Sequence, residues 1–234
     1  MPLHIGIVGC SAEGAALCYR TICAEGAARL GPHAHPEVSM HTPSLAEYVR
    51  CLEAGDRQGV AGLMLASARK LAAAGAELLV CPDNTIHQAW DLVAPHSPRP
   101  WLHIADVVAH AAQQRGFRRV GILGTAWLVR SDVYPALLGA RGIEAVRPDD
   151  ADRDLVARII MDELVPGVVR PQSTDRLVAV IERLRGRGCD AVALACTELP
   201  LVLGDGNSPL PTLDSTRLLA RAALDRALAQ PDTA

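Results

Sequence analysis

The chain has 234 residues, enough to bury a hydrophobic core without the help of disulfides or metal ions. Half of the residues are hydrophobic, 21% are charged and the formal net charge is −3, which excludes a disordered chain and a basic surface for nucleic acid. Seven cysteines, an odd number with no Cys-x-x-Cys pair, fit neither a secreted disulfide framework nor a structural zinc site.

The amino terminus lacks the charged and apolar regions of a signal peptide. No apolar run approaches the roughly 20 residues that a membrane-spanning helix needs. We therefore expect a soluble, cytoplasmic protein with free thiols, and neither a nucleic acid nor a membrane as its partner.

Short apolar runs alternate with longer segments of helical periodicity along the chain, an alternation typical of α/β folds. The runs expected to form strands are 3–9, 36–42, 76–81, 118–125, 142–148 and 189–196. The segments expected to contain helices are 12–30, 44–75 with a break near Gly55, a helix opening near Asn84, 101–116, 131–141, 150–164, 174–187 and, after a strand end, 210–228.

An internal repeat indicates two copies of one α/β unit. Residues 75–85 align without gaps on residues 188–198, an offset of 113 residues. The amino-terminal strand resembles the one that follows residue 118, with Gly6 opposite Gly121 at the similar offset of 115 residues. In this alignment the strand residues match, and a polar or reactive residue follows the strand in each half.

The repeat predicts two pseudo-symmetric domains with parallel sheets flanked by helices. We expect the first domain to comprise residues 1–105, completed by the carboxyl-terminal segment 208–234, and the second to comprise residues 106–207. Open α/β sheets bind ligands at the carboxyl ends of their strands. We therefore expect the active site in a cleft between the two domains.

Cys196 ends an apolar run and is followed by Thr197 and Glu198, a sequence that can open a helix close to the sulfur. A helix amino terminus lowers the pKa of a thiol, and the thiolate is the nucleophile or base of enzymes that use cysteine. The alternative is a buried structural cysteine, the more frequent fate of cysteines in apolar runs.

Asp83 occupies the equivalent point of the first half, directly before Asn84 and Thr85. Its carboxylate and Cys196 would flank a ligand in the cleft. Removing a proton from an α-carbon on one face and returning it on the other requires two such groups, with donors such as Asn84, Thr85 and Thr197 holding the substrate carboxylate. The alternative for Asp83 is a helix N-cap, and the two roles are compatible.

Four other residues are weaker candidates. His87 is either a proton shuttle, a group supporting the site, or an ordinary hydrogen-bonded histidine. Ser11 and Thr125 end equivalent strands and can supply polar contacts. Arg50 is a candidate for binding a distal carboxylate of the substrate, or simply an exposed charge on a helix.

The sequence favours chemistry without a cofactor. Lys70 is the one lysine of the chain and falls on the solvated face of a predicted helix, which disfavours a pyridoxal phosphate Schiff base. His33 and His35 have no third ligand placed near them by the sequence, so no metal site is expected.

Several long passages resemble the aspartate/glutamate racemase family, especially its cofactor-independent aspartate racemase and broad-specificity racemase branches. They are HIGIVGCSAEGAALCYRTI, AGAELLVCPDNTIHQAW, RVGILGTAWLVRSDVYPALL, PDDADRDLVARIIMDELVPG and GCDAVALACTELPLVLG. The resemblance implies two pseudo-symmetric α/β domains with the active site at their interface, a homodimer, and racemisation by two bases without pyridoxal phosphate or metal.

Carried over residue by residue, the second family cysteine is Cys196, and the first family site lies in the Asn-Thr-x-His motif at 84–87. The chain departs from the family where a cysteine commonly precedes Asn-Thr, because Asp83 stands there and Cys81 lies two residues earlier. In an extended segment Cys81 would sit about 6 to 7 Å further back, so we favour Asp83.

These observations predict a cofactor-independent amino-acid racemase or epimerase with Asp83 and Cys196 as its acid/base pair. The expected binding residues are Ser11, Arg50, Asn84, Thr85, Thr125 and Thr197, and those expected to support them are Cys81, His87 and Glu198. The alternatives are a one-thiol lyase or isomerase acting on a small dicarboxylate, and a carboxylate-binding relative without turnover.

Overall fold

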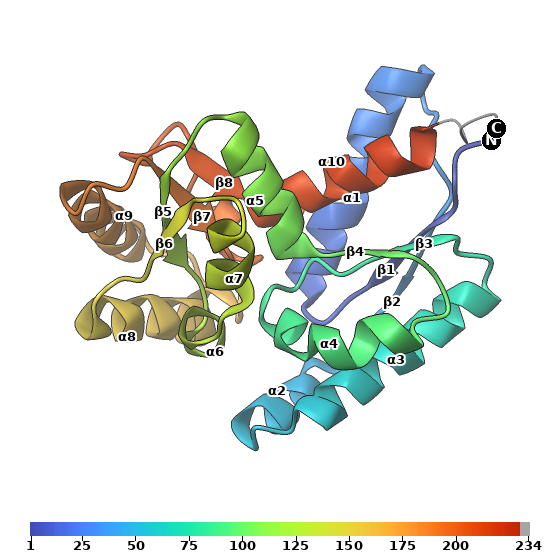
Figure 1. The fold of residues 1–234 in the computed structure, drawn as a ribbon, viewed down its shortest axis with the longest axis horizontal. Coiled ribbons are helices and arrows are strands. Elements are labelled where there is room, and N and C mark those ends of the chain that lie inside the picture. Colours follow the sequence, from blue (N-terminus) through green and yellow to red (C-terminus); the bar gives the residue numbers. More distant parts are fainter. Residues whose placement is uncertain (230–234) are drawn as a thin grey trace. The chain divides into compact units, whose positions relative to one another are not determined.

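The computed structural model describes residues 1–229. The chain divides into two compact units, one of Met1–Ile104 with the segment from Thr216 onward, and one of Ala105–Ser215. Each unit is built around its own four-stranded parallel sheet (Figure 1). The predicted α/β fold with two parallel sheets flanked by helices is confirmed.

The first unit has the strand order β2-β1-β3-β4. Its strands are β1 (Ile5–Val8), β2 (Val38–His41), β3 (Leu78–Val80) and β4 (Trp101–Leu102). Its helices are α1 (Ala12–Leu30), α2 (Leu45–Glu53), α3 (Arg57–Ala73), α4 (Trp90–Val93), the 3-10 turns η1 (Thr85–Ala89) and η2 (Ala94–His96), and the carboxyl-terminal α10 (Ser215–Leu228). Side chains of α2, α3 and α4 form a core with β1 and β3.

The second unit has the corresponding order β6-β5-β7-β8. Its strands are β5 (Arg119–Leu123), β6 (Glu144–Val146), β7 (Ala191–Leu194) and β8 (Thr212–Asp214). Its helices are α5 (Ile104–Gln114), α6 (Ala126–Arg130), α7 (Val133–Gly139), α8 (Asp150–Arg158), α9 (Pro171–Gly186), the π-helical turn η3 (Ile159–Leu164) and the 3-10 turn η4 (Leu199–Leu201). The core packs α8, η3 and α9 against β5 and β7.

The two sheets repeat each other in register as well as in strand order. Ile5 pairs with Leu78 in the first sheet, and Val120 pairs with Ala191 in the second. These are the partners that the sequence offsets of 115 and 113 residues predict. The main-chain N–H of His4 donates to the Glu77 carboxylate, just as that of Arg119 donates to Asp190.

The structure differs from the expected domain boundaries at one segment. The sequence predicts that residues 208–215 belong to the first unit. In the structure β8 pairs with β7, so these residues lie in the second unit. The chain returns to the first unit from Thr216, where α10 packs on α1 through the Arg221–Glu25 and Arg29–Asp225 ion pairs. The last five residues of the expected segment, 230–234, lie outside the described residues.

Among the described residues, no helix combines the length and the apolar character that crossing a membrane requires.

Candidate active site

The carboxyl ends of β1 and β3 meet at one edge of the first sheet, because the two strands pair in parallel. The Asp83 carboxylate, beyond the end of β3, accepts the N–H of Cys10 at 2.9 Å on Oδ2 and the N–H of Ser11 at 3.0 Å on Oδ1. These two residues follow β1 and precede α1. The geometry therefore brings Asp83 to a cysteine that the sequence analysis did not assign to the site.

The setting of Asp83 favours its ionised form. Each carboxylate oxygen receives a main-chain N–H, and hydrogen bonds to a charged acceptor stabilise it over the neutral acid. The carboxylate also lies at the amino terminus of α1, where the helix dipole favours negative charge. The carboxylate thus binds the two N–H groups that precede α1, a helix far from Asp83 in the sequence.

Asn84 and Thr85 open the η1 turn directly after Asp83. Asn84 is buried and Thr85 is half-buried. Ser11 is the N-cap of α1, since its Oγ accepts the N–H of Gly14 at 3.2 Å. Ser11, Asp83, Asn84 and Thr85 are thus brought together with Cys10, and these five residues are called the first cluster below.

His87 is buried beneath Asp83, with both ring nitrogens bound to the main chain. Its Nε2 accepts the N–H of Ile104 at 3.4 Å, so its Nδ1 carries the proton and donates it to the Asp83 carbonyl oxygen at 3.0 Å. Burial, and secondarily the charge of His103, holds the pKa of His87 well below its usual value. These contacts make His87 a neutral group that positions the Asp83 segment.

Cys81 is fully buried and its Sγ donates to the Asp83 carbonyl oxygen at 3.8 Å. Burial, and next the charge of Asp83, raises the pKa of this thiol well above its usual value. Cys81 therefore packs beneath the first cluster as a protonated thiol.

The second sheet presents a thiol and a carboxylate at the end of β7. The Cys196 Sγ donates to Glu198 Oε2 at 3.0 Å, and the Thr197 hydroxyl donates to the same oxygen at 2.7 Å. All three side chains are more than nine-tenths buried. The helix expected after Cys196 is only the three-residue 3-10 turn η4, so Glu198 rather than a long helix is the polar neighbour of the sulfur.

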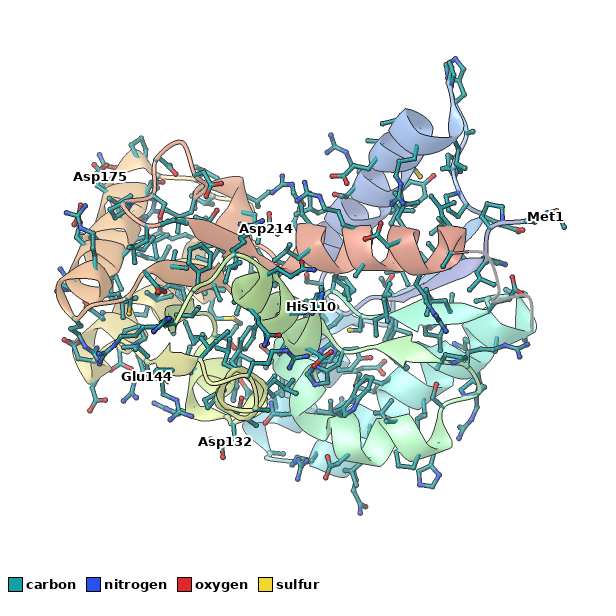
Figure 2. The ribbon with its side chains drawn as sticks, turned by 45° about the horizontal axis from the view of Figure 1, so that its top comes forward. Met1, His110, Asp132, Glu144, Asp175 and Asp214 are labelled. Atoms are coloured by element: carbon teal, nitrogen blue, oxygen red, sulfur yellow. The ribbon has the colours of Figure 1, made fainter. Side chains whose placement is uncertain are left out.

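Thr125 ends the neighbouring strand, since β5 and β7 pair in parallel. Its Oγ1 accepts the N–H of Leu128 at 3.2 Å and caps α6, the role that Ser11 has for α1. Thr125, Cys196, Thr197 and Glu198 are called the second cluster below. Asp214 follows on the next strand, where β8 passes into α10 (Figure 2).

Two residues weighed in the sequence analysis lie away from these clusters. Arg50 is exposed near the end of α2 and makes no side-chain hydrogen bond or ion pair within the described chain. Lys70 is exposed on α3, and its Nζ lies 3.0 Å from Nε2 of His41. No group of three or more His, Cys, Asp or Glu side chains suited to holding a metal ion occurs within residues 1–229.

Comparison with known proteins agrees with this architecture. The profile of the family described as Asp/Glu/Hydantoin racemase matches residues 5–223. A protein from Yersinia pestis assigned as an Asp/Glu racemase has a crystal structure with a TM-score of 0.88 and 33% identity, covering 97% of this chain and 100% of that one.

Two further relatives are similar over most of their length. An aspartate racemase homologue from Pyrococcus horikoshii OT3 has a TM-score of 0.83 and 28% identity, covering 97% of this chain and 99% of that one. The broad specificity amino-acid racemase RacX of Bacillus subtilis (strain 168) is 25% identical over 163 residues, which are 68% of this chain and 69% of that protein.

Proposed function

Because the chain belongs to the Asp/Glu/hydantoin racemase family, we propose that it is an amino-acid racemase or epimerase that works without a cofactor. In this proposal the first cluster, through Asp83, and the second cluster, through Cys196, exchange the α-proton on opposite faces of one substrate. The substrate class is a small amino acid, in keeping with the racemases that the chain resembles.

One observation carries the proposal. Asp83 and Cys196 stand at equivalent positions of the repeat, each just beyond the carboxyl end of a central strand and each flanked by amide or hydroxyl groups. A two-base reaction needs this kind of duplicated acid/base position, because the proton leaves one face of the α-carbon and arrives at the other.

Deprotonation of an amino acid at its α-carbon places negative charge on the substrate carboxylate. Preorganised donors lower the energy of such an enediolate most when they point at the developing charge. Asn84, Thr85 and Thr197 are the donors proposed to do so. Ser11 and Thr125 are proposed to contribute as well, because their hydroxyl groups follow the equivalent strands β1 and β5.

On the second side, Glu198 supplies the proton acceptor that a thiol requires. An unperturbed thiol has a pKa of about 8.5 and is mostly protonated at pH 7. Through the 3.0 Å hydrogen bond from Cys196, Glu198 can accept the thiol proton as the sulfur becomes a thiolate base. In the opposite direction the Cys196 thiol donates its proton to the α-carbon.

The test is α-proton exchange in D₂O, followed by proton NMR with separate L- and D-amino acids and by chiral analysis of the product. The wild type is compared with Cys196→Ala and Asp83→Asn. We expect exchange with inversion in the wild type and loss of inversion in both variants. Absence of exchange with every amino acid of the panel would refute the racemase proposal.

A second candidate is a lyase or isomerase that uses the Cys196 thiol alone on a small dicarboxylate. It is favoured by the two N–H groups that hold Asp83 ionised, since a group held in this way is a poor proton donor. Exchange with retained configuration would support this reaction. Binding of a carboxylate ligand without any exchange would support a relative that has lost turnover.

A further inference from the structure

We infer that Cys10 is the thiol that exchanges the α-proton in the first cluster, and that Asp83 is the carboxylate that accepts the thiol proton. This inference rests on the proposed racemase function and identifies the reacting atom on its first side as the Cys10 sulfur.

Cys10 and Asp83 are neighbours in the structure although 73 residues separate them in the sequence. The N–H of Cys10 donates to the Asp83 carboxylate at 2.9 Å, which fixes the main chain of Cys10 beside that group. Cys10 follows β1, so it stands at the same edge of the sheet as Asp83. A side chain there lies where parallel α/β sheets bind their ligands.

Accessibility separates Cys10 from the other thiols around Asp83. Cys10 is 7% exposed, which matches Cys196 at 7% and Asp83 at 8%, whereas Cys18 and Cys81 are 0% exposed. Burial, and next the charge of Asp83, raises the pKa of the Cys18 thiol to about 12. Of these three residues, only Cys10 retains exposed surface, and its main-chain N–H binds the Asp83 carboxylate.

Tyr48 of α2 adds a donor to this place. Its side chain is fully buried. Burial raises the pKa of Tyr48, the nearby Cys81, Cys10 and Asp83 side chains raise it further and a hydrogen bond with Ser67 lowers it, so these groups lie together around the phenol. A protonated phenol beside Cys10 can stabilise negative charge that forms there during proton transfer.

The inference makes the two clusters chemically alike. In the second cluster the Cys196 thiol donates to the Glu198 carboxylate, and in the first cluster the Asp83 carboxylate binds the main-chain N–H of Cys10, whose thiol we pair with it. If Asp83 alone faced the Cys196 thiol, the two proton-transfer groups would have very different ordinary pKa values, about 3.9 and 8.5. Two thiols are matched, so each can act as base in one direction and as acid in the other.

The proton transfers balance without any redox change. The Cys10 S–H bond breaks as its proton passes to Asp83, which leaves a thiolate. The thiolate forms a new S–H bond with the α-proton, while the electrons of the Cα–H bond move into the substrate as an enediolate. The Cys196 thiol then gives its proton to the opposite face of the α-carbon and becomes a thiolate.

The first experiment measures α-deuterium uptake in D₂O separately from each enantiomer of the amino acid that the wild type racemises. We expect Cys10→Ser to slow uptake from one enantiomer by about 100-fold or more. The other enantiomer should still exchange, with retained configuration, because Cys196 removes and returns its proton. The matched control is Cys18→Ala, a buried thiol near Asp83, which should exchange both enantiomers as the wild type does.

The second experiment needs no turnover by a variant. The wild-type protein is treated with iodoacetamide, and the rate of alkylation of each cysteine is followed by peptide mass spectrometry with and without the racemised amino acid. We expect Cys10 and Cys196 to react before Cys18 and Cys81, and the amino acid to protect both.

The outcomes distinguish this inference from the proposed function. Racemisation that survives in Cys10→Ser but is abolished in Asp83→Asn would overturn the role of Cys10 and leave the racemase proposal standing. Failure of Cys10 to react with iodoacetamide while Cys196 reacts would do the same. Absence of α-proton exchange in the wild type would instead refute the proposed function itself.

Discussion

The carboxylates of the two clusters are held by different kinds of donor. Asp83 accepts main-chain N–H groups, whose protons stay on nitrogen, so these hydrogen bonds supply no proton to the carboxylate. Glu198 accepts a thiol and a hydroxyl, and the thiol proton can move to the carboxylate. Glu198 is therefore expected to govern the ionisation of Cys196 directly.

Replacing Glu198 by glutamine removes this proton acceptor with little change in size. We expect Glu198→Gln to slow α-proton exchange at pH 7 by about 100-fold. The deficit should shrink as the pH rises through the ordinary thiol pKa of about 8.5, because hydroxide then ionises the thiol. Exchange rates from pH 6 to about pH 10 measured by NMR check this.

The matched control for that variant is Glu163→Gln. Glu163 lies in η3 of the same unit, and its carboxylate accepts the Ser173 hydroxyl at 2.6 Å. It should exchange like the wild type across the pH range. Parallel pH profiles for Glu198→Gln and the wild type would show that Glu198 does not accept the Cys196 proton.

His87 links the first cluster to the pH dependence of stability. Its pKa is well below the usual value in the folded protein, so the unfolded chain binds its proton more tightly. Stability from neutral His87 is complete above the unfolded pKa of about 6.5 and is lost as the pH falls toward the folded pKa. In that window His87 alone should lower the free energy of unfolding by about 1.4 kcal/mol per pH unit.

Urea unfolding between pH 7.5 and about 5 measures this slope. His87→Gln should reduce the slope, because the variant has no imidazole to protonate. His96→Gln is the control, since His96 is exposed after α4 and should leave the slope unchanged. An equal slope in the wild type and in His87→Gln would contradict the assignment.

Local sequence patterns singled out the groups proposed to react but not their contacts. The offset of 113 residues singled out Asp83 and Cys196, and both stand beyond strand ends. The contact between Cys10 and Asp83 joins residues that are far apart in sequence, so only the parallel pairing of β1 and β3 creates it. No periodicity within either segment contains that information.

At the scale of elements, long helices were predictable and short turns were not. The periodicity gave α1 its observed bounds, and the predicted break at Gly55 falls between α2 and α3, where Gly55 has a φ of +65°. The helices expected after Asp83 and Cys196 open instead with 3-10 turns. Hydrophobic periodicity cannot separate such turns from the start of a helix, because they are too short for the helical repeat to recur several times.

The central strands of both sheets depend on a glycine at the same register position. A Cβ at Gly6 would lie 2.6 Å from Leu79 Cδ2, and one at Gly121 would lie 2.8 Å from Leu184 Cδ1. Both distances are far below van der Waals contact, so the added methyl group must displace packed leucines. The repeat thus extends from strand register to the packing of helices on the strands.

We therefore expect Gly6→Ala and Gly121→Ala each to lower the free energy of unfolding by about 1 to 3 kcal/mol, as overpacked cores do. Urea unfolding followed by circular dichroism measures the change. The control is Gly62→Ala, whose new methyl group meets nothing within 4 Å. Because alanine favours the helical conformation more than glycine does, the free energy of unfolding should rise by up to about 1 kcal/mol. A neutral Gly6→Ala would show that the strand tolerates a side chain there.

At the scale of the whole molecule, the chain passes twice between the two units. It leaves the first unit after Ile104 and returns at Thr216, so α10 belongs to the unit that holds β1, β2, β3 and β4. The sequence predicts such a return, but from residue 208, which would include β8. A three-residue strand carries too little pattern to reveal its partner, and the pairing of β8 with β7 decides its place.

The return of α10 makes the fold of the first unit depend on the end of the chain. Leu219 of α10 is fully buried, and the N–H of Leu3, just before β1, donates to the carbonyl of Ala227 at 2.9 Å. Removing the buried part of a leucine leaves a cavity, so Leu219→Ala should lower the free energy of unfolding by about 2 to 5 kcal/mol.

The first cluster is part of that same unit, whereas the second cluster is built on β5 and β7. Leu219→Ala should therefore lose α-proton exchange at a lower urea concentration than the wild type, together with the circular dichroism signal. Leu201→Ala is the control, because Leu201 is 46% exposed on η4 and its truncation should change stability by less than about 0.5 kcal/mol. Equal urea midpoints for Leu219→Ala and Leu201→Ala would show that α10 does not stabilise the unit that carries Asp83.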